Sequence, residues 1–365
     1  MVSTPNITTA ESLLPLLGTA HSPFLLDVRE PDEFADWVIP GAVNIPLGQL
    51  EARLAEVPSD RGIVVICAKG ARAHSGAAML AVRGITASVM DGGMSAWATT
   101  YDSVEVTLAA ATVIQLRRRG KGCLSYLIGA GTAAAVIDPS TDIDRYTSLA
   151  SHHGFRITHV FDTHLHADHV SGGRALAEAT GATLVLNPAD TFHYPYTPLT
   201  DGLSVELEHN VHLTVEAVSA PGHTQGSTVY RLGDAALFTG DTLFLESVGR
   251  PDLADQAEEF AHALYATLHT RILTLADDIL IFPAHWGDAV PVTFGELVTA
   301  RLGDLRPVLP ALAYSEEDFV NWALTHVKDR PPNYIEIVKF NAGMSTLSAE
   351  EISEMELGPN RCAIA

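Results

Sequence analysis

The chain has 365 residues, of which 47% are hydrophobic and 18% are charged. At ~150 residues per domain this length predicts about two folded domains, and the composition excludes a disordered chain. The chain has 22 basic and 44 acidic residues, which gives a net charge of −22. This excess repels nucleic acids and anionic membranes, so neither is an expected partner.

The N-terminal segment and the cysteines indicate a cytoplasmic protein. The segment MVSTPNITTAESLLPLLG contains no basic residue, and Pro15 interrupts its short apolar run, so we expect no signal peptide. No apolar stretch reaches the ~18 residues of a membrane span. Cys67, Cys123 and Cys362 are an odd, widely spaced set, which argues against a disulfide framework and for a reducing compartment.

Residues 1–103 predict an α/β domain. Residues 23–28 (PFLLDV) and 62–67 (GIVVIC) are apolar runs bounded by turn residues, which is typical of buried parallel strands. Residues 72–84 (RAHSGAAMLAVRG) favour an Ala-rich helix that ends at a glycine. The alternation of strands and helices indicates a sheet with helices on its faces.

A second pattern follows residues 99–108, which we expect to be a linker, and it defines a domain over residues 107–365 with a C-terminal extension. Its strands and helices favour a two-sheet αββα sandwich over a doubly wound sheet. The predicted strands have the sequences TVIQLRR, CLSYLIG, AAAVIDP, FRITHVF, ATLVL, LTVEAV, STVYRL, AALFTG and ILIFPAH, and the clearest helix is EEFAHALYATLHTRIL.

Cys67 ends an apolar strand and opens a loop that leads into the predicted helix. Backbone N–H groups at the start of a helix, together with Lys69 and Arg72, favour the thiolate, which is the nucleophilic form of cysteine. Gly70 allows the loop to curl around the sulfur. A buried structural cysteine is the alternative, but it would not need two cations within five residues.

The first domain resembles the rhodanese family over residues 8–103. The resemblance rests on DVRE (27–30), IPGAVNIP (39–46), the loop CAKGAR (67–72) and DGG with a following Trp (91–97). It departs from the family at Val38, where His is common. The resemblance implies that Cys67 is the nucleophile that holds a transferred sulfur, with Lys69 and Arg72 as further catalytic residues.

The second domain contains the densest histidine cluster of the chain. The motif HLHADH follows a predicted strand, and PGHT, TGDT and PAH each follow later strands, where loops gather at one sheet edge. Imidazole and carboxylate groups suit Zn, Fe and Mn, so this pattern predicts a metal site rather than a polar surface turn. Its residues are His164, His166, Asp168, His169, His223, Asp241 and His285.

These motifs resemble the metallo-β-lactamase superfamily over residues 107–300. Residues 243–253 (LFLESVGRPDL), 330–334 (RPPNY) and 360–362 (NRC) are similar to the glyoxalase II-like persulfide dioxygenases. That resemblance implies one iron(II) per chain, bound by His164, His223 and Asp241. This is a facial triad with open positions for O2 and substrate. The remaining residues of the cluster, His166, Asp168, His169 and His285, would then orient the ligands.

The ligand set also fits a dinuclear zinc site. In that alternative His164, His166 and His223 bind one ion, Asp168, His169 and His285 bind a second, and Asp241 bridges them. The protein would then be a glyoxalase II-like thioester hydrolase. The fused rhodanese-like domain favours the persulfide enzyme, since it has little use beside a thioesterase.

Arg250 and Trp286 are the predicted substrate-binding residues. Thiol persulfides such as that of glutathione contain carboxylates, which Arg binds bidentately. A structural ion pair between Arg250 and Asp252 is the alternative. Trp286-Gly287 stands where glutathione-using relatives commonly have Asp-Tyr. Persulfides of thiols other than glutathione are therefore also candidate substrates.

The combined hypothesis is a persulfide dioxygenase coupled to a sulfurtransferase. The metal domain would oxidise a small thiol persulfide with O2 to sulfite and thiol, a sulfide-detoxifying reaction, and Cys67 would exchange sulfur with thiosulfate or sulfite. Binding both reactants at one metal is a proximity device. The rhodanese unit could instead serve only docking or sensing. The sequence does not determine which thiol carries the persulfide, in which direction sulfur is transferred, or whether the protein forms a homodimer.

Overall fold

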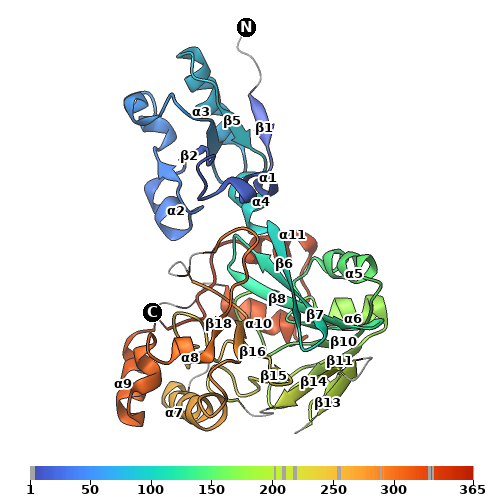
Figure 1. Ribbon diagram of the computed structural model, residues 1–365. Coiled ribbons are helices and arrows are strands. Elements are labelled where there is room, and N and C mark those ends of the chain that lie inside the picture. The colour runs from blue at the N-terminus through green and yellow to red at the C-terminus, as the bar shows by residue number, and fades with distance from the viewer. Residues whose placement is uncertain are drawn as a thin grey trace.

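The protein is described here from a computed structural model that covers residues 5–200, 203–207, 211–216, 220–252, 256–287, 290, 292–327, 330 and 333–364. Figure 1 shows an N-terminal unit in blue above a larger unit coloured from green to red. Strand β6 (Tyr101–Leu108) leads from the first unit into the second.

The N-terminal unit is a five-stranded parallel sheet in the order β1-β5-β4-β2-β3 with helices on both faces. Its two buried clusters lie on opposite faces of the sheet, around Val65 and Trp97 respectively. Its elements are β1 (Asn6–Thr8), α1 (Ala10–Leu13), η1 (Leu14–Leu16), β2 (Phe24–Asp27), α2 (Pro31–Asp36), β3 (Val43–Asn44), η2 (Leu47–Gln49), η3 (Leu54–Glu56), β4 (Ile63–Ile66), α3 (Ala71–Val82), β5 (Ser88–Met90) and α4 (Gly93–Ala98).

The second unit consists of two sheets packed face to face. The first sheet, in the order β12-β11-β10-β9-β8-β7-β6, is antiparallel from β6 to β9 and parallel from β9 to β12. Its strands are β6, β7 (Ala111–Arg118), β8 (Cys123–Ala130), β9 (Ala133–Ile137), β10 (Arg156–Phe161), β11 (Thr183–Leu186) and β12 (Thr197–Pro198).

The second sheet has the order β13-β14-β15-β16-β17-β18 and is antiparallel except between β16 and β17. A buried cluster that includes Tyr126, Phe161, Phe238 and Phe282 fills the space between the sheets. The strands are β13 (Ser204–Leu207), β14 (Val211–Glu216), β15 (Val229–Leu232), β16 (Ala236–Gly240), β17 (Leu280–Pro283) and β18 (Ala300–Arg301).

Helices cover the outer faces of the two sheets. Side chains of α5 and α6 pack on the first sheet around Tyr146 and Leu176, and those of α7, α8 and α9 pack on the second around Leu264 and Phe319. The helices are α5 (Ile143–His152), α6 (Gly173–Thr180), α7 (Ala257–Thr267) with its π-helical continuation η4 (Leu268–Ile272), α8 (Leu302–Leu305), η5 (Pro310–Ala313), α9 (Glu316–Thr325), α10 (Tyr334–Asn341) and α11 (Ala349–Met355).

The predicted fold class, an α/β unit followed by an αββα sandwich, is confirmed, but the predicted linker is wrong. Residues 101–108 form β6, which pairs along its whole length with β7. Its exposed and half-buried residues alternate, as in an edge strand with one face on the protein. Residues 217–218, 253 and 331–332, which belong to predicted segments, lie outside the described residues.

The two units contact each other through hydrogen bonds at the start of the second unit. Trp37 Nε1 donates to the Gly120 carbonyl at 2.8 Å, and Arg118 Nε donates to the Ala98 carbonyl at 2.6 Å. A Cβ atom at Gly120 would lie 2.3 Å from the Trp97 carbonyl oxygen, so this approach requires glycine. Among the described residues, none of the helices is both long and apolar enough to cross a bilayer.

Candidate functional site

Cys67 lies between the last residue of β4 and the start of α3, as the sequence predicts. The Gly70 N–H donates to its sulfur at 3.1 Å, and Gly70 has a φ of 107°, which residues with a side chain rarely adopt. The cysteine is only 1% exposed. The loop therefore curls around its own sulfur and directs a backbone N–H at it.

The two cations of this loop differ in their surroundings. Arg72 Nη1 and Nη2 lie 2.6 and 2.7 Å from the Glu33 carboxylate on α2, whereas Lys69 is exposed. The Arg72 hydrogen bonds lower the pKa of Glu33 to about 2. The guanidinium beside Cys67 is thus held in place by a carboxylate, and Lys69 is free to meet solvent.

The backbone of the cysteine loop rests on the start of α4. The Met94 N–H donates to the Cys67 carbonyl at 2.9 Å, and the Ser95 N–H donates to the Ala68 carbonyl at 3.1 Å. Gly93 has a φ of 57°, and a Cβ there would lie 2.1 Å from the Cys67 carbonyl oxygen. The second glycine of the Gly-Gly pair is therefore required by its close packing against the Cys67 carbonyl.

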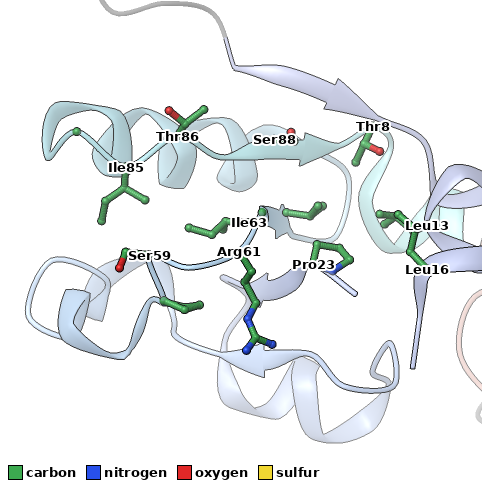
Figure 2. Close-up of a pocket in the computed structure, with 14 residues that line it drawn as sticks. Thr8, Leu13, Leu16, Pro23, Ser59, Arg61, Ile63, Ile85, Thr86 and Ser88 are labelled. Carbon is green, nitrogen blue, oxygen red and sulfur yellow. The ribbon is translucent and has the colours of Figure 1, made fainter. Parts of the chain in front are cut away.

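A surface hollow of about 640 Å³ in the same unit lies away from Cys67 and its loop. Figure 2 shows Pro23, Ile63 and Ser88 on its walls, which stand at the beginning of β2, β4 and β5. Cys67 follows the opposite end of β4. The hollow and Cys67 are therefore at opposite ends of the parallel sheet.

In the second unit, His164, His223 and Asp241 converge from three loops that follow β10, β14 and β16. Asp241 Oδ2 lies 3.7 Å from His164 Nε2 and 3.3 Å from His223 Nε2. All three residues are at most 3% exposed, and these three atoms have no hydrogen-bond partner among the described residues. Unpaired polar atoms that meet at one buried point fit a shared metal ion.

Hydrogen bonds orient both imidazoles toward that point. The Thr163 hydroxyl donates to Asp138 and therefore accepts from His164 Nδ1 at 2.9 Å. His223 Nδ1 donates to the Arg250 carbonyl at 2.9 Å. Burial lowers the pKa of both histidines, so both rings are neutral with Nε2 as a lone-pair donor, the form that binds metals.

Asp241 uses its two oxygens for different purposes. Oδ2 faces the histidine pair, whereas Oδ1 accepts a hydrogen bond from His285 Nδ1 at 2.6 Å. Burial opposes ionisation of Asp241, but the positive charge of His285 keeps its pKa below the ordinary range. His285 also lies 2.8 Å from Asp168, and the two carboxylates raise its pKa well above normal against the effect of burial.

The other residues of the motif lie around this triad. His166 Nε2 contacts Asp138 at 3.0 Å, with Asp162 at 4.0 Å, and its buried Nδ1 has no hydrogen-bond partner among the described residues. His169 Nδ1 contacts Asp168 Oδ1 at 3.0 Å. The seven predicted residues are thus brought together, and they divide into the triad and a surrounding set of contacts.

The structure adds residues that the sequence did not reveal, and most come from the C-terminal segment. Asn341 Nδ2 donates to the carbonyls of His166 and His169, both at 2.9 Å, and Asn341 Oδ1 accepts from the Ser171 N–H. Glu356 accepts from the Val170 N–H at 2.5 Å and forms a buried ion pair with Arg118. These contacts fix the backbone of the loop that contains His166 and His169.

Two cysteines also reach the site. The backbone of Cys123 pairs with that of His285 in an isolated antiparallel β-bridge. Cys362 is held near the site by a hydrogen bond from the Arg250 N–H to its carbonyl. Ligand atoms of Cys123 and Cys362 lie within 4.8 Å of those of His285. In the sequence they stand 41 or more residues from the motif histidines, and only the tertiary fold brings them close.

The two predicted substrate-binding residues are buried. Arg250 is 1% exposed, and its Nε and Nη2 lie 2.7 and 2.9 Å from the two Asp252 oxygens. This is the ion pair considered as the alternative from the sequence, and it supports His223 through the Arg250 carbonyl. Trp286 is 9% exposed and packs in the core between the sheets. Substrate contact by either side chain stays a prediction.

Comparisons with known families agree with this division of the chain. The Rhodanese-like domain family matches residues 9–100, and the Metallo-beta-lactamase superfamily matches residues 118–285. Persulfide dioxygenase ETHE1, mitochondrial, of Bos taurus is 30% identical over 206 residues, which cover 55% of this chain and 76% of that protein.

Two further similar proteins correspond to the two functions considered from the sequence, a thioester hydrolase and a persulfide dioxygenase. Hydroxyacylglutathione hydrolase of Anaeromyxobacter dehalogenans is 37% identical over 153 residues, which cover 40% of this chain and 58% of that protein. The crystal structure of ETHE1 from Myxococcus xanthus superposes with a TM-score of 0.56 at 29% identity, covering 64% of this chain and 99% of that one.

Proposed function

Since the chain belongs to the metallo-β-lactamase superfamily, in the family of the persulfide dioxygenases, with a rhodanese-like domain before it, we propose that it oxidises a small thiol persulfide with O2. In the balanced reaction, RSSH, O2 and H2O give RSH and H2SO3. The terminal sulfur is oxidised, O2 is reduced and the S–S bond breaks.

One observation supports this function best: three unpaired donor atoms converge at His164, His223 and Asp241. Two imidazoles and one carboxylate on one face are the donor set of non-haem iron(II) oxygenases. When bound there, iron(II) supplies the centre at which O2 and the persulfide sulfur are brought together. One iron per chain, rather than a dinuclear site, is our proposal.

The Asp241 contacts favour one ion at the triad over a carboxylate-bridged pair. An ion pair bridged through both carboxylate oxygens would need Asp241 Oδ1, which is already bonded to His285. His166 Nε2 is likewise bonded to Asp138. We therefore assign His166, Asp168, His169 and His285 to orienting the ligands, as the motif suggests.

The chain's own residues prepare the site for this reaction. Thr163 and the Arg250 carbonyl fix the two imidazoles, and His285 fixes the carboxylate. The ligand residues are nearly inaccessible to water. A dry, preoriented donor set needs little rearrangement when substrate arrives, and that lowers the barrier to reaction.

We propose sulfur transfer for the first unit. The Cys67 thiolate attacks the sulfane sulfur of thiosulfate, an S–S bond forms on Cys67, and sulfite leaves. The reverse step transfers that sulfur to sulfite made by the second unit and regenerates the thiolate. The Gly70 N–H and the adjacent Arg72 stabilise the anionic sulfur in both directions.

The test is metal analysis of the full-length protein together with O2 uptake on glutathione persulfide. Iron near one per chain with O2 consumption and sulfite formation supports the proposal. A protein that contains two zinc ions per chain, hydrolyses a glutathione thioester and consumes no O2 would instead be a hydrolase like its hydroxyacylglutathione hydrolase relatives.

A further inference from the structure

Lys121 is a buried cation in the turn between β7 and β8. It is only 3% exposed, and among the described residues its ammonium forms neither a hydrogen bond nor an ion pair. Lysine is almost never buried so deeply without a partner, because removing an ammonium from water costs more than its apolar stem gains. The fold alone therefore does not account for a lysine at this position.

The backbone of the turn is fixed on both sides of the lysine. The Lys121 carbonyl accepts hydrogen bonds from the N–H and the Nδ2 of Asn360, both at 3.0 Å. Gly122 has a φ of 76°, and a Cβ there would lie 2.6 Å from Asn360 Nδ2. On the other side, the Gly120 carbonyl accepts from Trp37 of the first unit. The side chain of Lys121 thus starts from a well-defined point next to the contact between the two units.

The surroundings of the ammonium place it beside the metal centre. The ionisable groups that act on it are Arg118, Asp168, Cys123 and Cys362. Ligand atoms of Asp168 and of the two cysteines each lie within 4.8 Å of those of His285, which in turn is bonded to Asp241 of the triad. Lys121 is therefore a cation at the edge of the candidate active site.

The nearby carboxylates are engaged elsewhere. Asp168 contacts two histidines, at 3.0 and 2.8 Å, and Glu356 forms a buried ion pair with Arg118. Burial and the positive charge of Arg118 lower the pKa of Lys121. An anion bound next to the ammonium would offset both effects and supply the missing partner.

We propose that the Lys121 ammonium binds the anionic sulfur group of the reactants, which are the ionised terminal sulfur of the persulfide before oxidation and the sulfite after it. This assignment rests on the proposed function. A chain with a net charge of −22 needs a local cation to attract an anion. Arg250, the residue expected to do so, is paired with Asp252. A lysine is a compact point charge that suits a single sulfur or a sulfite oxygen.

Sulfite is the probe for this site. Isothermal titration calorimetry measures its binding to the full-length protein that contains Cys67→Ser, so that sulfite has no persulfide on Cys67 to react with. The parent should bind one sulfite per chain. Lys121→Met should weaken binding about 10–100-fold, as expected for the loss of one charge-assisted hydrogen bond. Lys121→Arg retains the positive charge and should bind within several-fold of the parent.

Stability separates an anion-binding lysine from a structural one. Met keeps the length and the apolar stem of the side chain and removes an unpaired charge, so the urea midpoint of Lys121→Met should be unchanged or higher. Lys121→Gln removes the charge while staying polar, and it should weaken sulfite binding to a similar extent. A fall in the midpoint of both variants would show that the lysine is structural and would refute the proposal.

A lysine elsewhere in the chain serves as the matched control. Lys339→Met removes an exposed lysine that is paired with Glu336, and sulfite should bind it as it binds the parent. Two results would overturn the proposal directly: a parent that binds no sulfite, or equal sulfite affinity in the parent and in Lys121→Met.

Sulfite binding is measured without persulfide or O2, so the two proposals can fail separately. A protein that binds sulfite through Lys121 and consumes no O2 would retain the anion site and lose the proposed oxidation. A Lys121→Met protein with unchanged sulfite affinity and an unchanged KM for glutathione persulfide in O2 uptake would lose the anion site and retain the oxidation.

Discussion

In the first unit the loop that curls around the Cys67 sulfur spans residues 67–72, whereas the contacts of the candidate metal centre extend from Cys123 to Cys362. The first site is made mainly of backbone: one N–H on the sulfur and a loop resting on α4. The second is made of side chains from many loops. A local site is specified by a short motif, and a dispersed one depends on the whole fold.

The sharpest way to test this separation is to remove the metal carboxylate. Asp241→Ala deletes the only carboxylate of the triad and the partner of His285, so bound iron and O2 uptake should fall to background. Sulfur transfer at Cys67 should be unchanged. Metal analysis and an oxygen electrode measure both effects, with the exposed Asp234→Ala as control. Loss of sulfur transfer as well would show that the units are not independent.

The reciprocal change removes the sulfur nucleophile. Cys67→Ser should abolish thiosulfate-dependent sulfur transfer and leave O2 uptake on added glutathione persulfide intact, because no triad residue comes from the first unit. Formation of thiocyanate from thiosulfate and cyanide measures the first activity. Should O2 uptake on the added persulfide stop too, Cys67 would be the obligatory carrier of the sulfur that is oxidised.

The dispersed site should also be sensitive to residues far from the metal. Glu356→Gln leaves Arg118 buried without its charged partner, which costs about 3–5 kcal/mol of stability. It also weakens the support of Val170, so metal affinity should fall about 10–100-fold. Urea unfolding and metal titration measure these effects. Glu354→Gln, exposed on α11, should change neither, and equal losses in both variants would contradict the argument.

The smallest expected effect concerns the carboxylate that holds Arg72. Glu33→Gln removes the ion pair at the edge of the Cys67 loop, and we expect only a several-fold loss of sulfur transfer. Since Arg72 lowers the pKa of Glu33 from 4.5 to about 2, the pair is intact above pH 4.5 and is lost as the pH falls toward 2.

Rate–pH profiles measure this contribution. The wild type should lose sulfur transfer in that acid range, and Glu33→Gln should lack this limb of the profile. Asp32→Asn, on the same helix and exposed, serves as the control and should keep the wild-type profile. An unchanged profile in Glu33→Gln would show that the ion pair does not position Arg72 for transfer.

The parts that the sequence predicted share a physical basis. Continuous apolar runs such as 62–67 are strands because burial on both faces requires them, and HLHADH is recognisable because its ligands are close in sequence. The linker prediction failed because β6 is an edge strand, in which polar residues alternate with apolar ones and no continuous apolar run forms. Asn341 and Glu356 have no local pattern, since their role is fixed by contacts more than 170 residues away.

The pairing of the segment after Asn360 with the rest of the site has a consequence for how the protein is made. Ile364 donates to the Val248 carbonyl, and Asn360 Nδ2 donates to the Lys121 and Trp286 carbonyls. At ~5–20 residues per second, a ribosome makes this segment ~10–40 s after His164. Until then the loops around the site lack these contacts, so the nascent chain would bind metal weakly, and metal loading follows synthesis of this segment.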